Sequence, residues 1–144
     1  YDILAAGFPA DRTRPCFLLS DGSAVSYGQL ETSAGRIAAL LRQRGVIAGD
    51  RVVAQTEKSP QTVMLYLAVL KLGAIYVPLN WRLSPGELAD LVADCEPALL
   101  LGDASLTAAG LEGQLLQRLA QVHRRCQWIR AAGVAGVAQV LRHG

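Results

Sequence analysis

The segment "LKLGAIYVPLN", Leu70 to Asn80, combines the end of an apolar helix, a glycine and a short apolar strand. Lys71 is its only charged residue, and it contains no obvious catalytic group. Gly73 suits the position after a helix, because glycine adopts a left-handed backbone at little cost. We therefore expect a buried helix that ends here and a core strand over Ala74 to Leu79.

The residues before this segment predict a strand and the start of the helix. Val52 to Ala54 form an apolar run of the buried kind after the turn-forming pair Gly49-Asp50. Ser59 can cap a helix, and Pro60 suits its first position because the N–H that proline lacks would be unpaired there. The helix is apolar on nearly every side and should be covered by neighbours. This order of strand, helix and strand predicts an α/β fold, with a parallel-type sheet and packed helices in layers.

Further toward the N-terminus the sequence predicts a hairpin and an amphipathic helix. The apolar runs Cys16 to Leu19 and Ala24 to Val25 flank Asp21-Gly22, a pair suited to a tight turn. Ser26 then opens a Ser-x-x-Gln capping box, after which apolar residues recur at helical spacing until Gly45.

Toward the C-terminus the pattern continues with another helix and strand. Ser84 begins a Ser-Pro-x-Glu helix start, and the inward positions are Leu88, Leu91 and Val92. Pro97 ends this helix, and Ala98 to Leu101 predict a further buried strand. Val137 to Leu141 could form one more strand.

A basic amphipathic helix is predicted over residues 111–132. Its apolar stripe consists of Leu115, Leu119, Val122, Cys126 and Ile129. All 12 acidic residues lie between Asp2 and Glu112, together with nine basic ones, a net charge of −3. Five arginines and no acid follow, a net charge of +5.

Length and composition favour one partial domain over residues 1–144. The chain is 51% hydrophobic, which allows a core, and is too short for two full domains. Its three cysteines form no CxxC pair, which favours reduced thiols in the cytoplasm over a zinc site or a disulfide framework. No apolar run reaches the roughly 18 residues of a membrane span. Because the chain starts at Tyr1 and its only methionine is Met64, we expect a piece of a longer reading frame or a processed product.

The search for catalytic motifs gives no nucleophile and no metal ligand. The patterns GxxxxGK[ST], GxGxxG, HExxH and GxSxG do not occur. Asp90 and Asp94 lie one helical turn apart, but a solvated helix face explains them better than a carboxylate pair. Tyr76 and Trp81 flank a predicted strand end, where core or rim packing is favoured over ligand binding. We expect His123 to be a solvated or half-buried side chain rather than a ligand. His143 lies next to the end of the sequence, and we expect no role for it.

Four motifs in order resemble a known superfamily. They are "VSYGQL" (25–30), "GDRVVAQ" (49–55), "LKLGAIYVPLN" (70–80) and "LSPGELADLVADCEP" (83–97). Together they are similar to the N-terminal part of the adenylate-forming superfamily, which comprises acyl-CoA synthetases, peptide-synthetase adenylation domains and luciferases. The resemblance covers Tyr1 to Asp103 well and the rest of the chain loosely.

Two subfamilies are represented in these motifs. The Glu57-Lys58-Ser59 helix start and the residues after it resemble malonyl-CoA synthetases, whereas "NWRLSPGELADLV" (80–92) resembles fatty-acyl-CoA synthetases. A malonate pocket needs an arginine or equivalent donors for the second carboxylate. Arg82 is the only arginine near a predicted strand end, and it belongs to the stretch that resembles fatty-acyl enzymes.

The resemblance implies an enzyme that needs ATP, Mg²⁺, CoA and a small carboxylic acid. Such enzymes bind ATP through a Ser/Thr/Gly-rich loop that ends in a lysine, and a mobile C-terminal domain completes the site. Nothing in this chain matches those segments, so the resemblance assigns it no catalytic, cofactor-binding or metal-binding residue. The resemblance implies that this chain is scaffold and is inactive alone. It also implies that the partner of this chain is the remainder of the same enzyme.

A non-catalytic interaction module is the alternative. In that case the basic helix over residues 111–132 would bind phosphates of nucleic acid or an anionic membrane. Five arginines without interleaved aromatic residues more often form a solvated face, so neither nucleic acid nor a membrane is expected as a partner.

Overall fold

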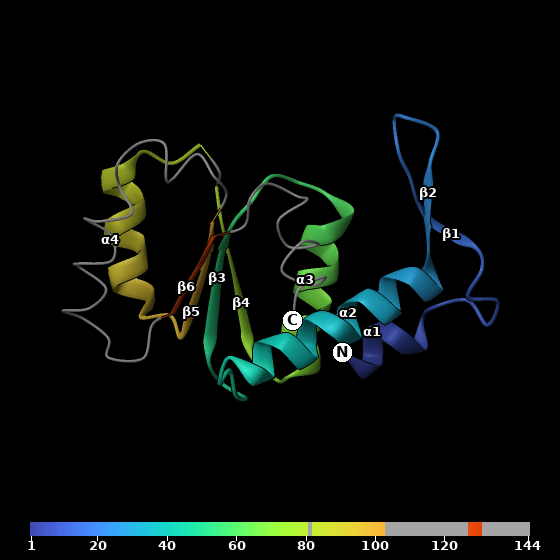
Figure 1. Cartoon of the computed structure of the whole chain (residues 1–144), viewed down its shortest axis with the longest axis horizontal. Coiled ribbons are helices and arrows are strands. Elements are labelled where there is room, and N and C mark those ends of the chain that lie inside the picture. Colours follow the sequence, from blue (N-terminus) through green and yellow to red (C-terminus); the bar gives the residue numbers. More distant parts are fainter. Residues whose placement is uncertain (81, 103–126, 131–144) are drawn as a thin grey trace.

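The computed structural model describes residues 1–80, 82–102 and 127–130, and it shows an α/β arrangement (Figure 1). The helices are α1 (Asp2–Ala6), α2 (Tyr27–Gln43), α3 (Pro60–Lys71) and α4 (Pro85–Cys95). The strands are β1 (Pro15–Leu18), β2 (Ala24–Ser26), β3 (Arg51–Gln55), β4 (Ile75–Leu79), β5 (Leu99–Gly102) and β6 (Gln127–Arg130).

The predicted hairpin and its helix are confirmed. Strands β1 and β2 pair antiparallel around Gly22, whose φ of 83° is the left-handed value that the turn requires. Ser26 then caps α2: its Oγ accepts from the Gln29 N–H, while Gln29 Oε1 accepts from the Ser26 N–H. This reciprocal box satisfies a helix N–H that would otherwise be unpaired. The helix ends before Gly45, also left-handed with φ 83°.

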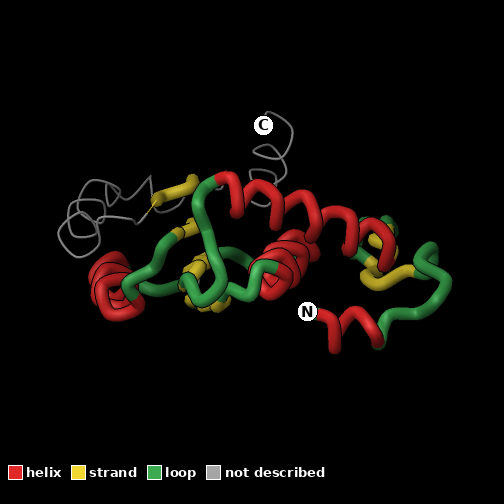
Figure 2. The backbone as a smooth tube through the Cα atoms, turned by 90° about the horizontal axis from the view of Figure 1, so that it is seen from below, coloured by secondary structure: helices red, strands yellow, loops and turns green. Residues whose placement is uncertain are grey.

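Strands β3 to β6 form a parallel sheet in the order β4-β3-β5-β6. Helix α3 connects β3 to β4, and α4 carries the chain back across β3 to β5. Figures 1 and 2 show α4 on one side of the sheet and α2 with α3 on the other. The two crossovers run in opposite directions with their helices on opposite faces, so they share one hand, as βαβ connections do.

Alternating residues of the central strands build two cores. Val52 and Ala54 of β3 pack in a large cluster with the apolar faces of α2 and α3. Val53 packs on the other face with Leu88 and Val92 of α4, in a smaller cluster. This alternation follows from the two-residue repeat of a strand, and it explains why Val52 to Ala54 in the middle of β3 are all apolar.

Three predictions for single elements are wrong. Leu91 was expected to point inward, but it is 39% exposed, because Leu88 and Val92 occupy the face of α4 that meets the sheet. The strand after Gly73 was expected to be a core strand, but β4 is the edge of the described sheet, so Ile75 is 49% exposed.

The third correction concerns the basic helix predicted over residues 111–132. Residues 127–130 form strand β6, which pairs with β5 from Leu99↔Gln127 to Gly102↔Arg130. Long-range pairing with a sheet edge has outweighed a local helical pattern here. The rest of that helix, apart from residues 127–130, and the strand expected over residues 137–141 lie outside the described residues.

Candidate functional site at the carboxyl edge of the sheet

The polar residues that the fold gathers lie where the parallel strands end. Gln55 ends β3 and Gly102 ends β5, and the two are paired in register. Leu79 ends β4 beside Gln55, and Asn80 follows it. In open parallel sheets ligands bind outside the carboxyl ends of strands, so this edge is the place to look for a site.

Gln55 is the one buried polar or charged side chain among the described residues. It is only 2% exposed. Its Nε2 donates to the backbone oxygen of Asn80 at 3.1 Å, which ties the end of β3 to the loop after β4. Its Oε1 is buried and has no partner within the described part of the chain. An unpaired buried acceptor costs about 1–3 kcal/mol, so this oxygen calls for a donor.

A chain of hydroxyl groups fixes the loop between β3 and α3. Thr62 Oγ1 donates to the Glu57 backbone oxygen at 2.8 Å, which uses its only hydrogen. Its oxygen also lies within hydrogen-bond distance of Thr56 Oγ1, at 3.2 Å, and of Ser59 Oγ, at 3.0 Å. Ser59 Oγ in turn accepts from the Thr62 N–H, the predicted helix cap. The loop that carries Glu57 and Lys58 is thus held by directed hydrogen bonds.

Tyr76 lies beside this hydroxyl chain. Burial raises the pKa of its phenol, and a hydrogen bond with Thr56 only partly offsets that effect. Its ring packs edge-on against Tyr66 of α3, with centroids 5.4 Å apart. Tyr76 is consequently a neutral packing residue at ordinary pH, as the sequence favoured. It is the second residue of β4, paired with Val52, rather than at the strand end.

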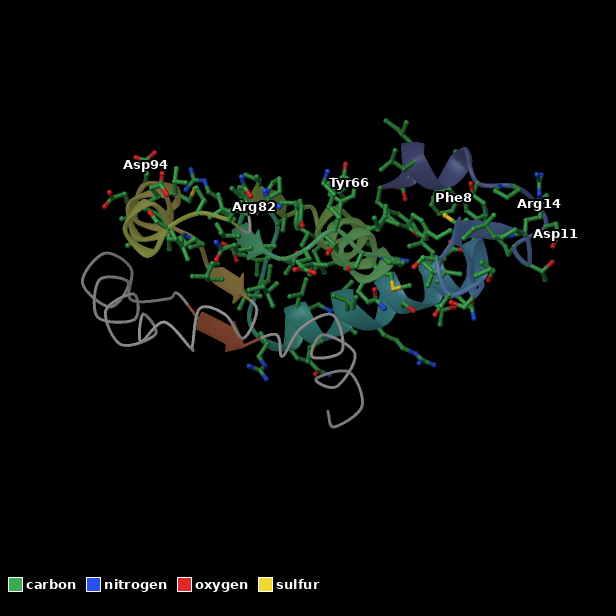
Figure 3. The ribbon with its side chains drawn as sticks, turned by 90° about the horizontal axis from the view of Figure 1, so that it is seen from above. Phe8, Asp11, Arg14, Tyr66, Arg82 and Asp94 are labelled. Carbon is green, nitrogen blue, oxygen red and sulfur yellow. The ribbon has the colours of Figure 1, made fainter. Side chains whose placement is uncertain are left out.

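The other candidates from the sequence do not assemble into a site. Asp90 and Asp94 are exposed on α4, as a solvated helix face predicts (Figure 3 labels Asp94). Within residues 1–80, 82–102 and 127–130, no group of three or more His, Cys, Asp or Glu side chains could hold a metal ion. Trp81, His123 and His143 lie outside the described residues.

Sequence reasoning missed one arginine position. The sequence singles out Arg82 as the only arginine near a predicted strand end, but Arg130 is the last residue of β6 and pairs with Gly102. The four-residue strand "QWIR" lacks flanking turn residues and fits the helical stripe equally well, so no local signal separates the two readings.

An open groove of about 600 Å³ lies at the other end of the molecule, between the hairpin and the start of α2. Its cation, Arg12, pairs with Glu31 at 3.4 Å, donates to the Pro9 oxygen and lies over the Phe8 ring. The first N–H groups of α2 are also satisfied: those of Tyr27 and Gly28 donate to backbone oxygens of residues 14 and 12. Nothing in this groove points to a ligand.

A parallel sheet covered by capped helices, with polar groups at its carboxyl edge, is an open α/β fold of the kind that binds ligands at that edge. The chain belongs to the family of AMP-binding enzymes, which it matches over residues 4–137. The superfamily resemblance of the four sequence motifs is thereby confirmed.

Individual relatives agree with this assignment. ATP-bound MatB from Rhodopseudomonas palustris superposes with a TM-score of 0.80 and 30% identity, over 94% of this chain and 26% of that one. The chain is 36% identical over 84 residues to indoleacetate–CoA ligase of Aromatoleum aromaticum, which is 58% of this chain and 16% of that protein. It is 43% identical over 82 residues to the hybrid PKS-NRPS synthetase xenE of Xenoacremonium sinensis, 57% of this chain and 2% of that protein.

The chain therefore spans a small part of these relatives, about a quarter or less of their length. Among the helices that the structure describes, none has the length and apolar character that crossing a membrane requires.

Proposed function

We propose that this chain is the N-terminal part of an AMP-forming acid–thiol ligase. Such an enzyme joins a carboxylate to ATP, releases pyrophosphate, and passes the acyl group from the adenylate to CoA with release of AMP. The observation that carries the proposal is the agreement with ATP-bound MatB over 94% of the chain at a TM-score of 0.80. Residues 1–144 then form a single partial domain within the cytoplasmic enzyme.

The role of this part is to provide scaffold rather than reacting groups. Within the described residues, no group of three or more His, Cys, Asp or Glu side chains could hold a metal ion. The sequence contains no GxxxxGK[ST] phosphate loop. Its contribution is a rigid sheet edge, where Gln55 and the hydroxyl chain around Thr62 hold the loops in place.

For the substrate we propose malonate, on the basis of the Glu57-Lys58-Ser59 helix start that resembles malonyl-CoA synthetases. A dicarboxylate leaves one carboxylate ionised in the pocket, and burying that charge unpaired would cost several kcal/mol. The pocket therefore needs an arginine or equivalent donors, which we expect from outside this chain.

An aromatic acid is the second candidate, favoured by the curated relatives. Besides indoleacetate–CoA ligase, they include 3-hydroxybenzoate–CoA ligase of an Aromatoleum species, 33% identical over 87 residues. A fatty acid is the third, because "NWRLSPGELADLV" resembles fatty-acyl enzymes. The interaction-module alternative has lost support, because residues 127–130 of its basic helix are a strand.

The test is a comparison of kcat/KM on the complete enzyme for malonate, acetate, 3-hydroxybenzoate and a medium-chain fatty acid. We expect malonate to be preferred. A preference for the aromatic or the fatty acid would overturn the malonate assignment and leave the ligase assignment intact. No carboxylate-dependent AMP formation with any acid would overturn the ligase assignment itself.

A further inference from the structure

The strand order of the parallel sheet reverses between β3 and β5. From β3 the chain moves to β4 on one side, then returns across β3 to β5 and continues to β6 on the other side. In open α/β sheets such a reversal is a topological switch point, and ligands bind outside the carboxyl ends of the strands that flank it. Here the two residues at that position are Gln55 and Gly102, which pair in register.

A second, independent observation falls on the same position. Gln55 lies on the sheet face of Val53, the face that α4 covers, and its neighbour in the pair is a glycine without a side chain. The side chain of Gln55 is oriented by its Nε2 donation to the Asn80 oxygen. With Nε2 so fixed, Oε1 is an oriented acceptor that no described residue satisfies.

The chemistry of this oxygen defines what it can bind. An amide oxygen accepts hydrogen bonds and repels carboxylate and phosphate oxygens, so it does not bind the reacting carboxylate or the triphosphate. The matching group is an N–H or O–H donor on the non-reacting part of a ligand. An adenine amino group and a pantetheine amide both supply such a donor.

We propose that Gln55 is a ligand-recognition residue of the ligase, whose Oε1 accepts a hydrogen bond from an N–H or O–H donor of a bound small molecule at the β3–β5 switch point. This inference rests on the proposed function and assigns a binding role within it. Gln55 holds no reacting atom, so it changes affinity for one ligand rather than the chemical step.

The test uses the complete enzyme with Gln55→Met, which keeps the length of the side chain and removes both polar atoms. We expect KM to rise about tenfold for a single substrate, with kcat little changed, since one hydrogen bond to a buried amide is worth roughly that factor. A rise in the KM for ATP would identify the adenine amino group as the donor to Gln55. A rise in the KM for CoA would identify a pantetheine amide as that donor. For the ATP case, purine riboside triphosphate, which lacks the amino group, should lose affinity in the wild type but not in Gln55→Met.

Two further variants separate recognition from a structural role. Gln55→Glu should restore KM, because a buried carboxyl stays protonated, donates to the Asn80 oxygen and keeps a carbonyl acceptor. Gln61→Met removes another amide whose Oε1 has no described partner, but at the start of α3 rather than at the switch point, and should leave every KM within about twofold. Loss of stability with every KM unchanged, or with all of them shifted alike, would overturn the proposal.

The failure of this inference can be distinguished from the failure of the proposed function. If the wild-type enzyme forms no acyl-adenylate, the proposed function fails, and calorimetric titration with ATP and with CoA still tests Gln55. Equal Kd values for wild type and Gln55→Met with both ligands would then overturn the recognition role.

Discussion

At the scale of single residues, both the backbone conformation of Gly73 and the space around it favour glycine over any other residue. Its φ of 70° lies in the left-handed region, and a Cβ placed on it would come within 3.2 Å of Ala48 Cβ. Its backbone oxygen also accepts from the Gly49 N–H at 2.9 Å, which joins the end of α3 to the turn before β3. One glycine therefore ends a helix and allows two loops to approach closely.

Replacing Gly73 by Val should lower the free energy of unfolding by more than about 1 kcal/mol, because a β-branched residue is strained at positive φ. Urea denaturation of the chain measures the change. Gly45→Val is the matched control, because Gly45 has φ 83° but a Cβ there meets no atom within 4 Å. A smaller loss at Gly45 isolates the contact with Ala48, and an unchanged midpoint for Gly73→Val would contradict the left-handed cap.

At the scale of elements, α2, α3 and α4 each begin with a serine whose Oγ accepts from a helix N–H three residues on. Each cap fixes the residue at which its helix begins. For α3 and α4 it therefore also fixes the length of the loop between the preceding strand and the helix, at the carboxyl edge of the sheet. In α4 the box is charged: the Oγ and the N–H of Ser84 donate to Glu87 Oε2 at 2.6 and 2.8 Å. These two hydrogen bonds hold the pKa of Glu87 below its ordinary value.

The start of α4 should consequently weaken in acid. Because the pKa of Glu87 is lower in the folded state than in the unfolded chain, its contribution to stability is complete above the unfolded value. That contribution is lost as the pH falls through the folded value. Glu87→Gln keeps an acceptor for Ser84 but does not titrate there, so the loss should disappear. Amide hydrogen exchange of residues 87 and 88 from pH 6 downward checks this, and equal pH dependence in both proteins would count against the charged box.

In strand β4 a single proline removes a hydrogen-bond donor from the outer edge of the described sheet. The Ile75 N–H donates to the Asp50 oxygen on the β3 side at 2.8 Å. By alternation, Tyr76 and Pro78 therefore turn their backbone nitrogens to the outer edge, where proline offers no donor. Pro78 thus weakens the edge as a template for another strand.

Pro78→Val should promote self-association, because it restores an outward N–H on an exposed edge. Sedimentation velocity over a concentration series measures this. Pro78→Thr separates the causes: it restores the same N–H with a polar side chain. Self-association of both variants would support pairing through the sheet edge. Self-association of Pro78→Val alone would instead point to its apolar side chain as the cause. If neither variant self-associates, Pro78 does not protect the edge.

At the scale of the whole molecule, the described chain is a parallel sheet covered on both faces, with α2 and α3 on one and α4 on the other (Figure 2). Among the described residues the larger core lies under α2 and α3, and a smaller one lies under α4. Among the described residues no group of three or more His, Cys, Asp or Glu side chains could hold a metal ion, and the sequence contains no GxxxxGK[ST] phosphate loop.

We accordingly expect the 144-residue chain alone to show no carboxylate-dependent ATP–pyrophosphate exchange, because its sequence contains no Gly-rich loop with a lysine to stabilise the charge that develops on the phosphates. Exchange is measured with labelled pyrophosphate, with the complete enzyme as positive control and circular dichroism to verify that the chain is folded. Activity above a blank would show that this part carries its own phosphate site.

The sequence by itself determined the local features and the family. Serine caps, left-handed glycines and the apolar strands act within a few residues, so the hairpin, α2, α3, α4 and β5 were predicted with nearly correct bounds, and the ordered motifs identified the AMP-binding family. Tertiary structure decided the rest, because sheet position depends on partners far away in the chain. Pairing with β5 made residues 127–130 a strand, and the absence of a second neighbour in the described sheet exposed Ile75 of β4. The register of β3 with β5 brought Gln55 to a switch point that no local pattern reveals.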